Sequence, residues 1–137
     1  METSEEKTIR QILEEYRTIA VVGLSKNPEK DSHRVARYLQ SAGYRVIPVN
    51  PTAEEILGEK AYPRLSDIPF KVEVVDIFRP SAEAGAVVEE AISVGAKAVW
   101  MQLGIVNEEA AKKARNAGLD VVMDRCMMIE HRRLKSG

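Results

Sequence analysis

The residues with recognisable chemistry begin directly after an apolar run near the N-terminus. Residues 18–22 are apolar or β-branched, Gly23 follows them, and an amphipathic helical pattern starts after Ser32. A strand, a glycine turn and a helix together present free backbone N–H groups and the positive helix end to a phosphate. This turn is rich in hydroxyl groups and cations, namely Ser25, Lys26, Lys30, Ser32 and Arg34. The stretch therefore predicts a nucleotide-type ligand with several phosphates.

Each of these residues also has an ordinary structural explanation. Gly23 suits any tight turn after a strand, and Ser25 and Ser32 suit a turn and a helix cap. The side chains of Lys26 and Arg34 are of the kind that usually lies on a solvated surface. The residue types alone leave both interpretations open.

The bulk composition excludes several classes of protein. The chain has 137 residues, a formal net charge of −1, one cysteine and two histidines. One domain over residues 1–137 is expected, without a disulfide framework or a metal cluster. A nucleic-acid binder would carry a marked basic excess. The polar N-terminus and the absence of a long apolar run predict no signal peptide and no membrane segment, and hence a cytoplasmic protein.

Short strands and helices alternate along the chain. A helix capped by Thr3 and Glu6 is expected over residues 1–16, and helices are also expected after Ser32, Ser81 and Asn107. Strands are expected over residues 18–22, 44–49, 60–62, 72–77, 98–102 and 120–123. Pro48 is placed at the exit of the second strand, because proline cannot donate to a strand ladder. A helical turn is expected around residues 53–57, and a basic cluster follows residue 127.

This alternation predicts an α/β fold, a single doubly wound Rossmann-like domain. The sheet is expected to be mainly parallel, with strand order 3-2-1-4-5-6 and helices on both faces. The carboxyl ends of parallel strands share one rim, where ligands bind. The candidate residues on that rim are Gly23, Leu24, Ser25, Lys26, Asn50, Pro51, Phe78, Arg79, Gln102, Gly104 and Cys126.

A dinucleotide is the first ligand to consider for such a fold. Its fingerprint needs three glycines in the first loop and an acidic residue at the end of the second strand. Here the loop has only Gly23, and the second strand ends in Asn50. NAD is therefore disfavoured, whereas NADP, whose extra phosphate would suit the cations, remains an alternative.

Several motifs in order along the chain resemble those of the small, stand-alone coenzyme A-binding proteins. These proteins are similar to the CoA-binding domain of succinyl-CoA synthetase α-subunits and of ADP-forming acyl-CoA synthetases. The motifs are Val21–Ser25, Pro28, Ser32, Tyr44–Pro51, Asp76–Pro80, Trp100–Gly104 and Asp124–Met128. The resemblance implies coenzyme A as the ligand, with its phosphates on the first loop and on the helix that carries Ser32 and Arg34. It also implies adenosine contacts near Asn50 and a pantetheine arm along Phe78–Pro80, Gln102 and Cys126.

Four further residues carry expectations of their own. Trp100 lies inside a strand and is expected in the core, whereas His33 and His131 are expected at the surface. Cys126 is either a small buried hydrophobe or a thiol beside Arg125 at the ligand rim. If the thiol end of CoA reaches Cys126, a mixed disulfide becomes chemically accessible.

The sequence favours a binding module over an enzyme. No nucleophile–base pair or pair of carboxylates can be assembled from its residues. The expected function is non-catalytic binding of coenzyme A or acyl-CoA. The alternative is an NADP-dependent oxidoreductase or redox sensor. A separate ligase subunit and a homodimer are the protein partners left open.

Overall fold

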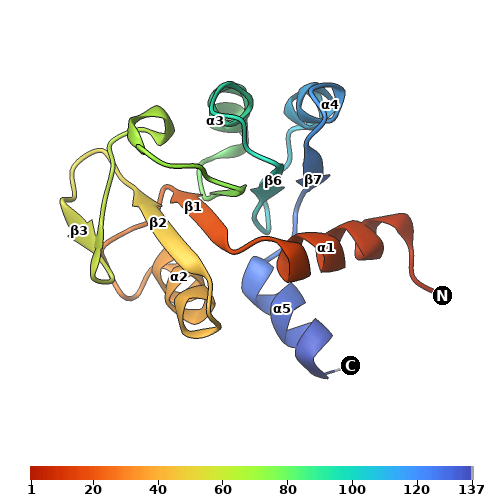
Figure 1. Ribbon diagram of the computed structural model, residues 1–137, viewed down its shortest axis with the longest axis horizontal. Coiled ribbons are helices and arrows are strands. Elements are labelled where there is room, and N and C mark those ends of the chain that lie inside the picture. The colour runs from red at the N-terminus through yellow and green to blue at the C-terminus, as the bar shows by residue number, and fades with distance from the viewer. Residues whose placement is uncertain (137) are drawn as a thin grey trace.

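The computed structural model describes residues 1–136 and contains one parallel sheet covered by helices on both faces (Figure 1). Within these residues the sheet has five strands in the order β2-β1-β5-β6-β7. Their bounds are β1 Thr18–Val22, β2 Arg45–Val49, β5 Val74–Ile77, β6 Ala98–Met101 and β7 Asp120–Val122. All four pairings are parallel. The predicted α/β Rossmann-like class is confirmed.

The helices divide between the two faces as the doubly wound topology requires. Figure 1 shows α1 (Ser4–Glu15), α2 (Asp31–Ser41) and α5 (Met127–Ser136) on one face. It shows α3 (Ser81–Ser93) and α4 (Glu108–Asn116) on the other. The predicted capping box of α1 is present, because Thr3 Oγ1 accepts from the backbone N–H of Glu6 and Glu6 accepts from that of Thr3. α5 was not expected from the sequence, where its residues were noted only for their basic charge.

The expected third strand is reduced to a single bridge. Tyr62 pairs with Val49 in parallel. The N–H of Tyr62 donates to the carbonyl of Pro48, and the N–H of Asn50 donates to the carbonyl of Tyr62. The place of this segment beside β2 agrees with the predicted order, but its prediction as a strand over residues 60–62 was wrong. The chain instead makes a separate antiparallel pair, β3 (Glu55–Ile56) and β4 (Glu59–Lys60), which is not hydrogen-bonded into the five-stranded sheet.

The helical turn expected over residues 53–57 was also wrong. Leu57 and Gly58 have φ values of 55° and 77°. Two successive positive φ values define the tight turn that joins antiparallel strands, and they are incompatible with a right-handed helix. Gly58 was the available signal for this turn, whereas a positive φ is uncommon for a residue such as Leu57.

Pro48 lies inside β2 rather than at its exit. Its carbonyl accepts the N–H of Tyr62, on the side of β2 that faces away from β1. Since the N–H and C=O of a strand residue point to the same side, the N–H that proline lacks would face the edge of the sheet. An edge is where a strand tolerates proline.

Parallel register places side chains in rows across each face. One row on the side of α2 and α5 contains Val21, Pro48, Asp76, Trp100 and Val122. Trp100 is fully buried, as predicted, and its indole N–H donates to the carbonyl of Arg125. The next positions along the strands on this face, Phe78 and Gln102, stand at the carboxyl rim.

His33 does not lie on the surface as expected. It is buried at the start of α2, and its Nδ1 has no hydrogen-bond partner within residues 1–136. His131 is partly buried, and its Nδ1 lies 2.7 Å from the hydroxyl of Tyr38. Burial lowers the pKa of both imidazoles.

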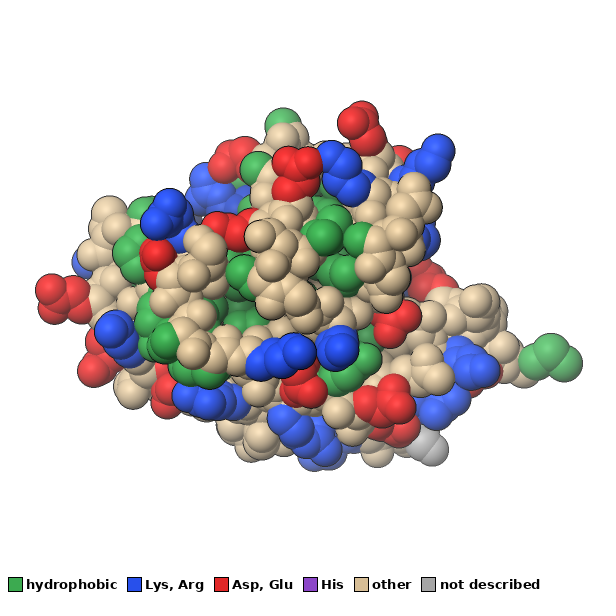
Figure 2. All heavy atoms as spheres, turned by 45° about the horizontal axis from the view of Figure 1, so that its top comes forward, with side chains coloured by type: hydrophobic (Ala, Val, Ile, Leu, Met, Phe, Trp, Pro, Cys, Tyr) green, Lys and Arg blue, Asp and Glu red, His purple; other side chains and the backbone are tan. Residues whose placement is uncertain are grey.

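Charged side chains of both signs are interspersed on the face drawn in Figure 2, with hydrophobic atoms in the hollows between them. This mixture agrees with the net charge of −1. Among residues 1–136, no helix combines the length and apolar character that crossing a bilayer requires.

Candidate functional site

The turn after β1 requires glycine for two physical reasons. Gly23 has a φ of +91°, which L side chains rarely adopt. A Cβ at this position would also lie 2.9 Å from the carbonyl oxygen of Phe78. The N–H of Gly23 donates to the carbonyl of Val49. Gly23 therefore packs the first loop tightly between the ends of β2 and β5.

The loop between β1 and α2 is held by its own polar side chains. Ser32 Oγ accepts the backbone N–H of Ser25 at 3.0 Å, and Ser25 Oγ accepts that of Asn27 at 3.0 Å. Asn27 Oδ1 in turn accepts the N–H of Glu29. The two predicted serines thus shape the loop. At the start of α2 the capping position is Lys30, which makes no side-chain capping bond.

The cations near this loop are partly neutralised. Arg34 forms an ion pair with Asp31 and donates to the carbonyl of Glu29. Arg79 pairs with Glu83 at 2.6 Å, in the first turn of α3. Lys26 is exposed.

Asn50 joins the ends of β1 and β2. Its amide donates to the carbonyl of Leu24 at 2.9 Å, and its Oδ1 accepts the N–H groups of Thr52 and Ala53. The side chain of Leu24 is fully buried, so only its backbone faces the rim. Pro51 is exposed beside Asn50.

A cavity of about 310 Å³, called the rim cavity below, opens between the start of α2 and the start of α5. It brings together four of the predicted residues, Arg34, Phe78, Gln102 and Cys126. Most of its other lining is apolar, from Val35, Leu103, Ile105, Met128 and Ile129, with Asp31 at one end. Arg79, Lys26 and Pro51 are outside this lining.

Gln102 and Gly104 shape the rim cavity from the end of β6. Gln102 is buried, and its Oε1 accepts the N–H of Met127 at 3.1 Å, which fixes the first turn of α5. The N–H of Gly104 donates to Asp124 Oδ1 at 2.7 Å. Cys126 lies between these two connections and is buried.

A second cavity of about 480 Å³, called the outer cavity, adjoins the first. The two share Leu103, Cys126 and Ile129. The outer cavity is also lined by Glu5, Met123, Asp124, Arg125, Glu130 and Arg133. Sequence reasoning missed it, because it depends on α5 and on the position of α1.

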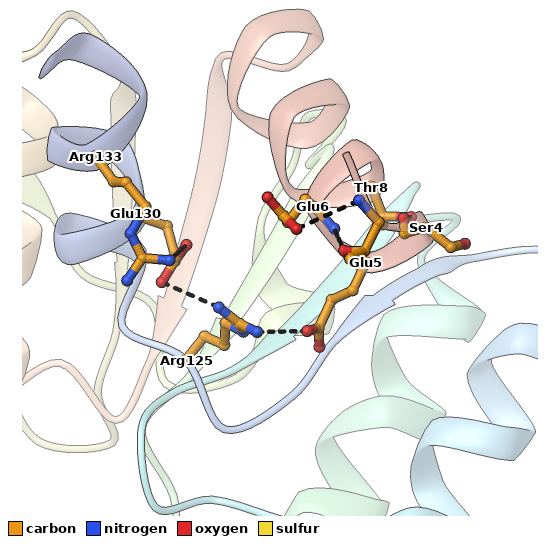
Figure 3. Close-up of polar contacts among 8 residues, drawn as sticks. Ser4, Glu5, Glu6, Thr8, Arg125, Glu130 and Arg133 are labelled. Atoms are coloured by element: carbon orange, nitrogen blue, oxygen red, sulfur yellow. Dashed lines mark hydrogen bonds and ion pairs between the residues drawn. The ribbon is translucent and has the colours of Figure 1, made fainter. Parts of the chain in front are cut away.

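Arg125 links three elements at the outer cavity. Figure 3 shows it between Glu5 of α1 and Glu130 of α5. The nitrogen–oxygen distances are 2.6 Å to Glu5 and 3.6 Å to Glu130. Arg133 also pairs with the buried Glu130, at 3.1 Å. Both arginines of the outer cavity are therefore paired with carboxylates that line the same cavity.

Asp76 is a buried acid without a partner. Neither carboxyl oxygen has a hydrogen-bond partner within residues 1–136, and the side chain is fully buried one row below Phe78 and Gln102. Burial raises the pKa of this carboxyl well above its ordinary value. Burial therefore favours the uncharged form of this carboxyl group.

The model of the family described as CoA binding domain matches residues 17–132, so this chain belongs to that family. A curated relative in Bacillus subtilis, "Uncharacterized protein YneT", is 41% identical over 131 residues, covering 96% of this chain and 97% of the relative. A hypothetical protein from Pyrococcus horikoshii has a solved structure with a TM-score of 0.92 at 48% identity. That match covers 98% of this chain and 97% of the other.

The chain is also similar to part of a much longer enzyme. "Acetate--CoA ligase [ADP-forming] II" of Archaeoglobus fulgidus is 31% identical over 100 residues. The match covers 72% of this chain but only 15% of the ligase. The suspected resemblance to stand-alone CoA-binding proteins and to acyl-CoA synthetases is confirmed at the level of the family.

Proposed function

We propose that this chain binds coenzyme A, free or acylated, at the carboxyl rim without catalysing a reaction on it. The observation that carries the proposal is the rim cavity, which places an apolar channel directly beside the start of α2. CoA has the matching polarity, with phosphates at one end and a weakly polar pantetheine arm at the other. Membership of the CoA binding domain family supports the same ligand.

The phosphates belong at the first loop. The first backbone N–H groups of α2 point along the helix axis toward the rim and carry partial positive charge. Lys30, at the capping position, makes no side-chain capping bond to these groups. Ser25 and Ser32 hold the loop in shape, and Lys26 and Arg34 supply charge at its border. The pairing of Arg34 with Asp31 lets the guanidinium exchange a partner on the protein for a phosphate.

The pantetheine arm belongs in the rim cavity. Phe78, Val35, Ile105 and Met128 supply apolar walls. Gln102 supplies a buried amide, whose Oε1 is already committed to α5. Cys126 lines the same cavity directly before α5, and we propose that the thiol end of the arm arrives there.

The absence of a reaction is part of the proposal. No group of three or more histidine, cysteine or acidic residues within residues 1–136 is arranged to hold a metal ion. His131 is engaged with Tyr38, and the buried Nδ1 of His33 has no partner. We propose accordingly that acyl transfer to or from the bound CoA requires a separate protein, for which a ligase subunit is the natural candidate.

Calorimetric titration with CoA, acetyl-CoA, NADPH and NADH tests the ligand. CoA should bind much more tightly than either nicotinamide nucleotide. NADPH binding as tight as CoA would overturn the proposal in favour of a dinucleotide-binding protein. Absence of binding by all four would leave only a role in protein contacts.

Replacement of two arginines tests the placement of the phosphates. Arg34→Ala and Arg79→Ala should each weaken CoA binding by ~1.5–3 kcal/mol if the guanidinium bonds to phosphate. Arg64→Ala is the matched control, because Arg64 is also an exposed arginine paired with an acid three residues away. An unchanged affinity removes the tested arginine from the site.

A second proposal concerns Cys126, the cysteine whose side chain lines both cavities. Its thiolate attacks one sulfur of oxidised CoA, forming a protein–CoA disulfide and releasing the other half as CoA thiolate. Mass spectrometry of non-reduced protein after incubation with oxidised CoA should show an adduct that a thiol reductant removes. The Cys126→Ser variant should show none. An unmodified wild-type protein would end this proposal.

Two further measurements test the proposed protein partners. Light scattering with and without CoA distinguishes a monomer from the homodimer that the sequence left open. Titration with a separately produced ligase subunit tests the other proposed partner.

A further inference from the structure

Two of the exposed large hydrophobic side chains line the same two cavities. Within residues 1–136, four such side chains are exposed, and apart from Met1 they are Leu103, Val106 and Ile129. Leu103 is 65% exposed and Ile129 is 43% exposed, and both line the rim cavity and the outer cavity together. Single exposed hydrophobic residues are common, but a group beside a cavity marks a binding surface.

The two cavities form one path with Cys126 at the junction. The rim cavity extends from Asp31 and Arg34 at the start of α2 to Leu103, Cys126 and Ile129. The outer cavity continues from those same three residues to Met123 and the cluster around Arg125. A CoA bound with its phosphates at α2 and its arm in the rim cavity would present its sulfur at this junction. A group attached to that sulfur would then enter the outer cavity.

The charges of the outer cavity determine which group it accepts. Its lining contains three acidic and two basic residues, a net charge of minus one. Both arginines are already matched, because Arg125 pairs with Glu5 and Glu130, and Arg133 pairs with Glu130 (Figure 3). An anionic acyl group would have to displace a carboxylate from an existing pair. The remaining lining, Leu103, Met123, Cys126 and Ile129, is apolar or weakly polar.

We infer that the outer cavity is the acyl subsite of this protein and that it takes an uncharged aliphatic acyl group. The inference rests on the proposed function and makes it narrower, because the preferred ligand becomes a CoA thioester of an uncharged acyl group instead of free CoA. The apolar residues at the junction gain burial only when the acyl chain is present.

Titration with CoA, acetyl-CoA, butyryl-CoA, hexanoyl-CoA and succinyl-CoA tests the inference. The dissociation constant should fall about two- to fourfold for each added methylene that becomes buried, up to ~0.8 kcal/mol each. Butyryl-CoA should therefore bind about tenfold more tightly than acetyl-CoA. Succinyl-CoA, which is similar in length to butyryl-CoA but anionic, should bind more weakly than butyryl-CoA.

Variants at the junction separate the acyl subsite from the rest of the site. Leu103→Ser should reduce the difference between butyryl-CoA and CoA, because it removes an apolar side chain that is largely exposed without ligand. Val106→Ser is the matched control, since Val106 is an exposed residue of the same loop that lines neither cavity. The control should keep the full difference.

Three results would overturn the inference. Equal affinity for CoA and all acyl derivatives would place the acyl group in solvent and overturn the subsite alone. Tighter binding of succinyl-CoA than of butyryl-CoA would overturn the conclusion that the outer cavity takes an uncharged acyl group. Failure of every derivative to bind would overturn the proposed function together with the inference.

Discussion

At the scale of single residues, the tightest constraint on the rim is the contact between Gly23 and Phe78. The missing side chain lets two backbone segments from β1 and β5 approach each other. The ends of these central strands form the floor on which the first loop rests. A side chain at Gly23 should therefore lower the free energy of unfolding.

Gly23→Ala should destabilise the protein by about 2–4 kcal/mol, because it adds an unfavourable φ to a clash with the backbone of Phe78. Gly43→Ala is the control, since Gly43 has a φ of +101° but no atom within 4 Å of an added Cβ. The control should cost less, about 1–2 kcal/mol. Urea unfolding of both variants measures the difference. Equal losses would show that the Phe78 contact carries no energy.

Asp76→Asn should alter the pH dependence of stability. Burial raises the folded-state pKa of Asp76 above its ordinary value of 3.8. Between the two pKa values the unfolded chain loses this proton and the folded chain keeps it, so the wild-type protein becomes less stable as pH rises. The slope approaches ~1.4 kcal/mol per pH unit.

The comparison with Asp76→Asn isolates this effect, because asparagine has no proton to lose. Thermal or urea unfolding from pH 4 to pH 8 should show the variant gaining stability relative to the wild type as pH rises. Parallel curves over this range would mean that a charged group pairs with Asp76 in solution and keeps the pKa of its carboxyl near the ordinary value.

At the scale of elements, α5 completes the rim. Its first turn is fixed by Gln102 and by Glu130, which lies between two arginines. Both cavities use residues of this helix. Loss of its docking should therefore affect ligand binding and stability together.

Glu130→Gln should lower the free energy of unfolding by about 1–3 kcal/mol, because it leaves Arg125 and Arg133 without their shared buried carboxylate. Glu89→Gln is the matched control, since Glu89 pairs with Lys113 on an exposed surface. Its stability should hardly change. Guanidinium unfolding compares the two variants, and equal effects would contradict a structural role for Glu130.

Element prediction succeeded where the hydrophobic pattern was long and capped. The capping box at Thr3 and Glu6 identified α1, and short apolar runs identified the main strands. Prediction failed where a few residues decide the turn. Leu57 and Gly58 make a hairpin through backbone geometry, and no Ser, Thr, Asp or Asn directly precedes α5 to mark its start.

At the scale of the whole molecule, the predicted strand order holds for the five strands that form the sheet. The rim followed from it, because parallel strands put their carboxyl ends together. The hydrogen bonds and ion pairs among the site residues could not be predicted from the strand order. The sequence indicates that Ser32, Arg34 and Asn50 are polar, but only the fold shows that Ser25, Asp31 and Leu24 already engage them.

Ligand binding should stabilise the whole fold. At a CoA concentration about 100 times the dissociation constant, the free energy of unfolding should rise by ~2.7 kcal/mol. For a chain of this length the midpoint of thermal unfolding should increase by roughly 10 °C. Differential scanning calorimetry measures the shift. Free pantetheine, which lacks the phosphates, should shift it much less, and an equal shift would contradict phosphate binding at the first loop.

The bond between Arg125 and Glu5 joins residues 120 positions apart. The apolar face of α1, with Ile9, Ile12 and Leu13, is buried in the same core cluster as Val122 and Met127. During synthesis on the ribosome, α1 therefore emerges long before the residues of β7 and α5 that cover it. A chain that stalls between these elements leaves the apolar face of α1 exposed to chaperones.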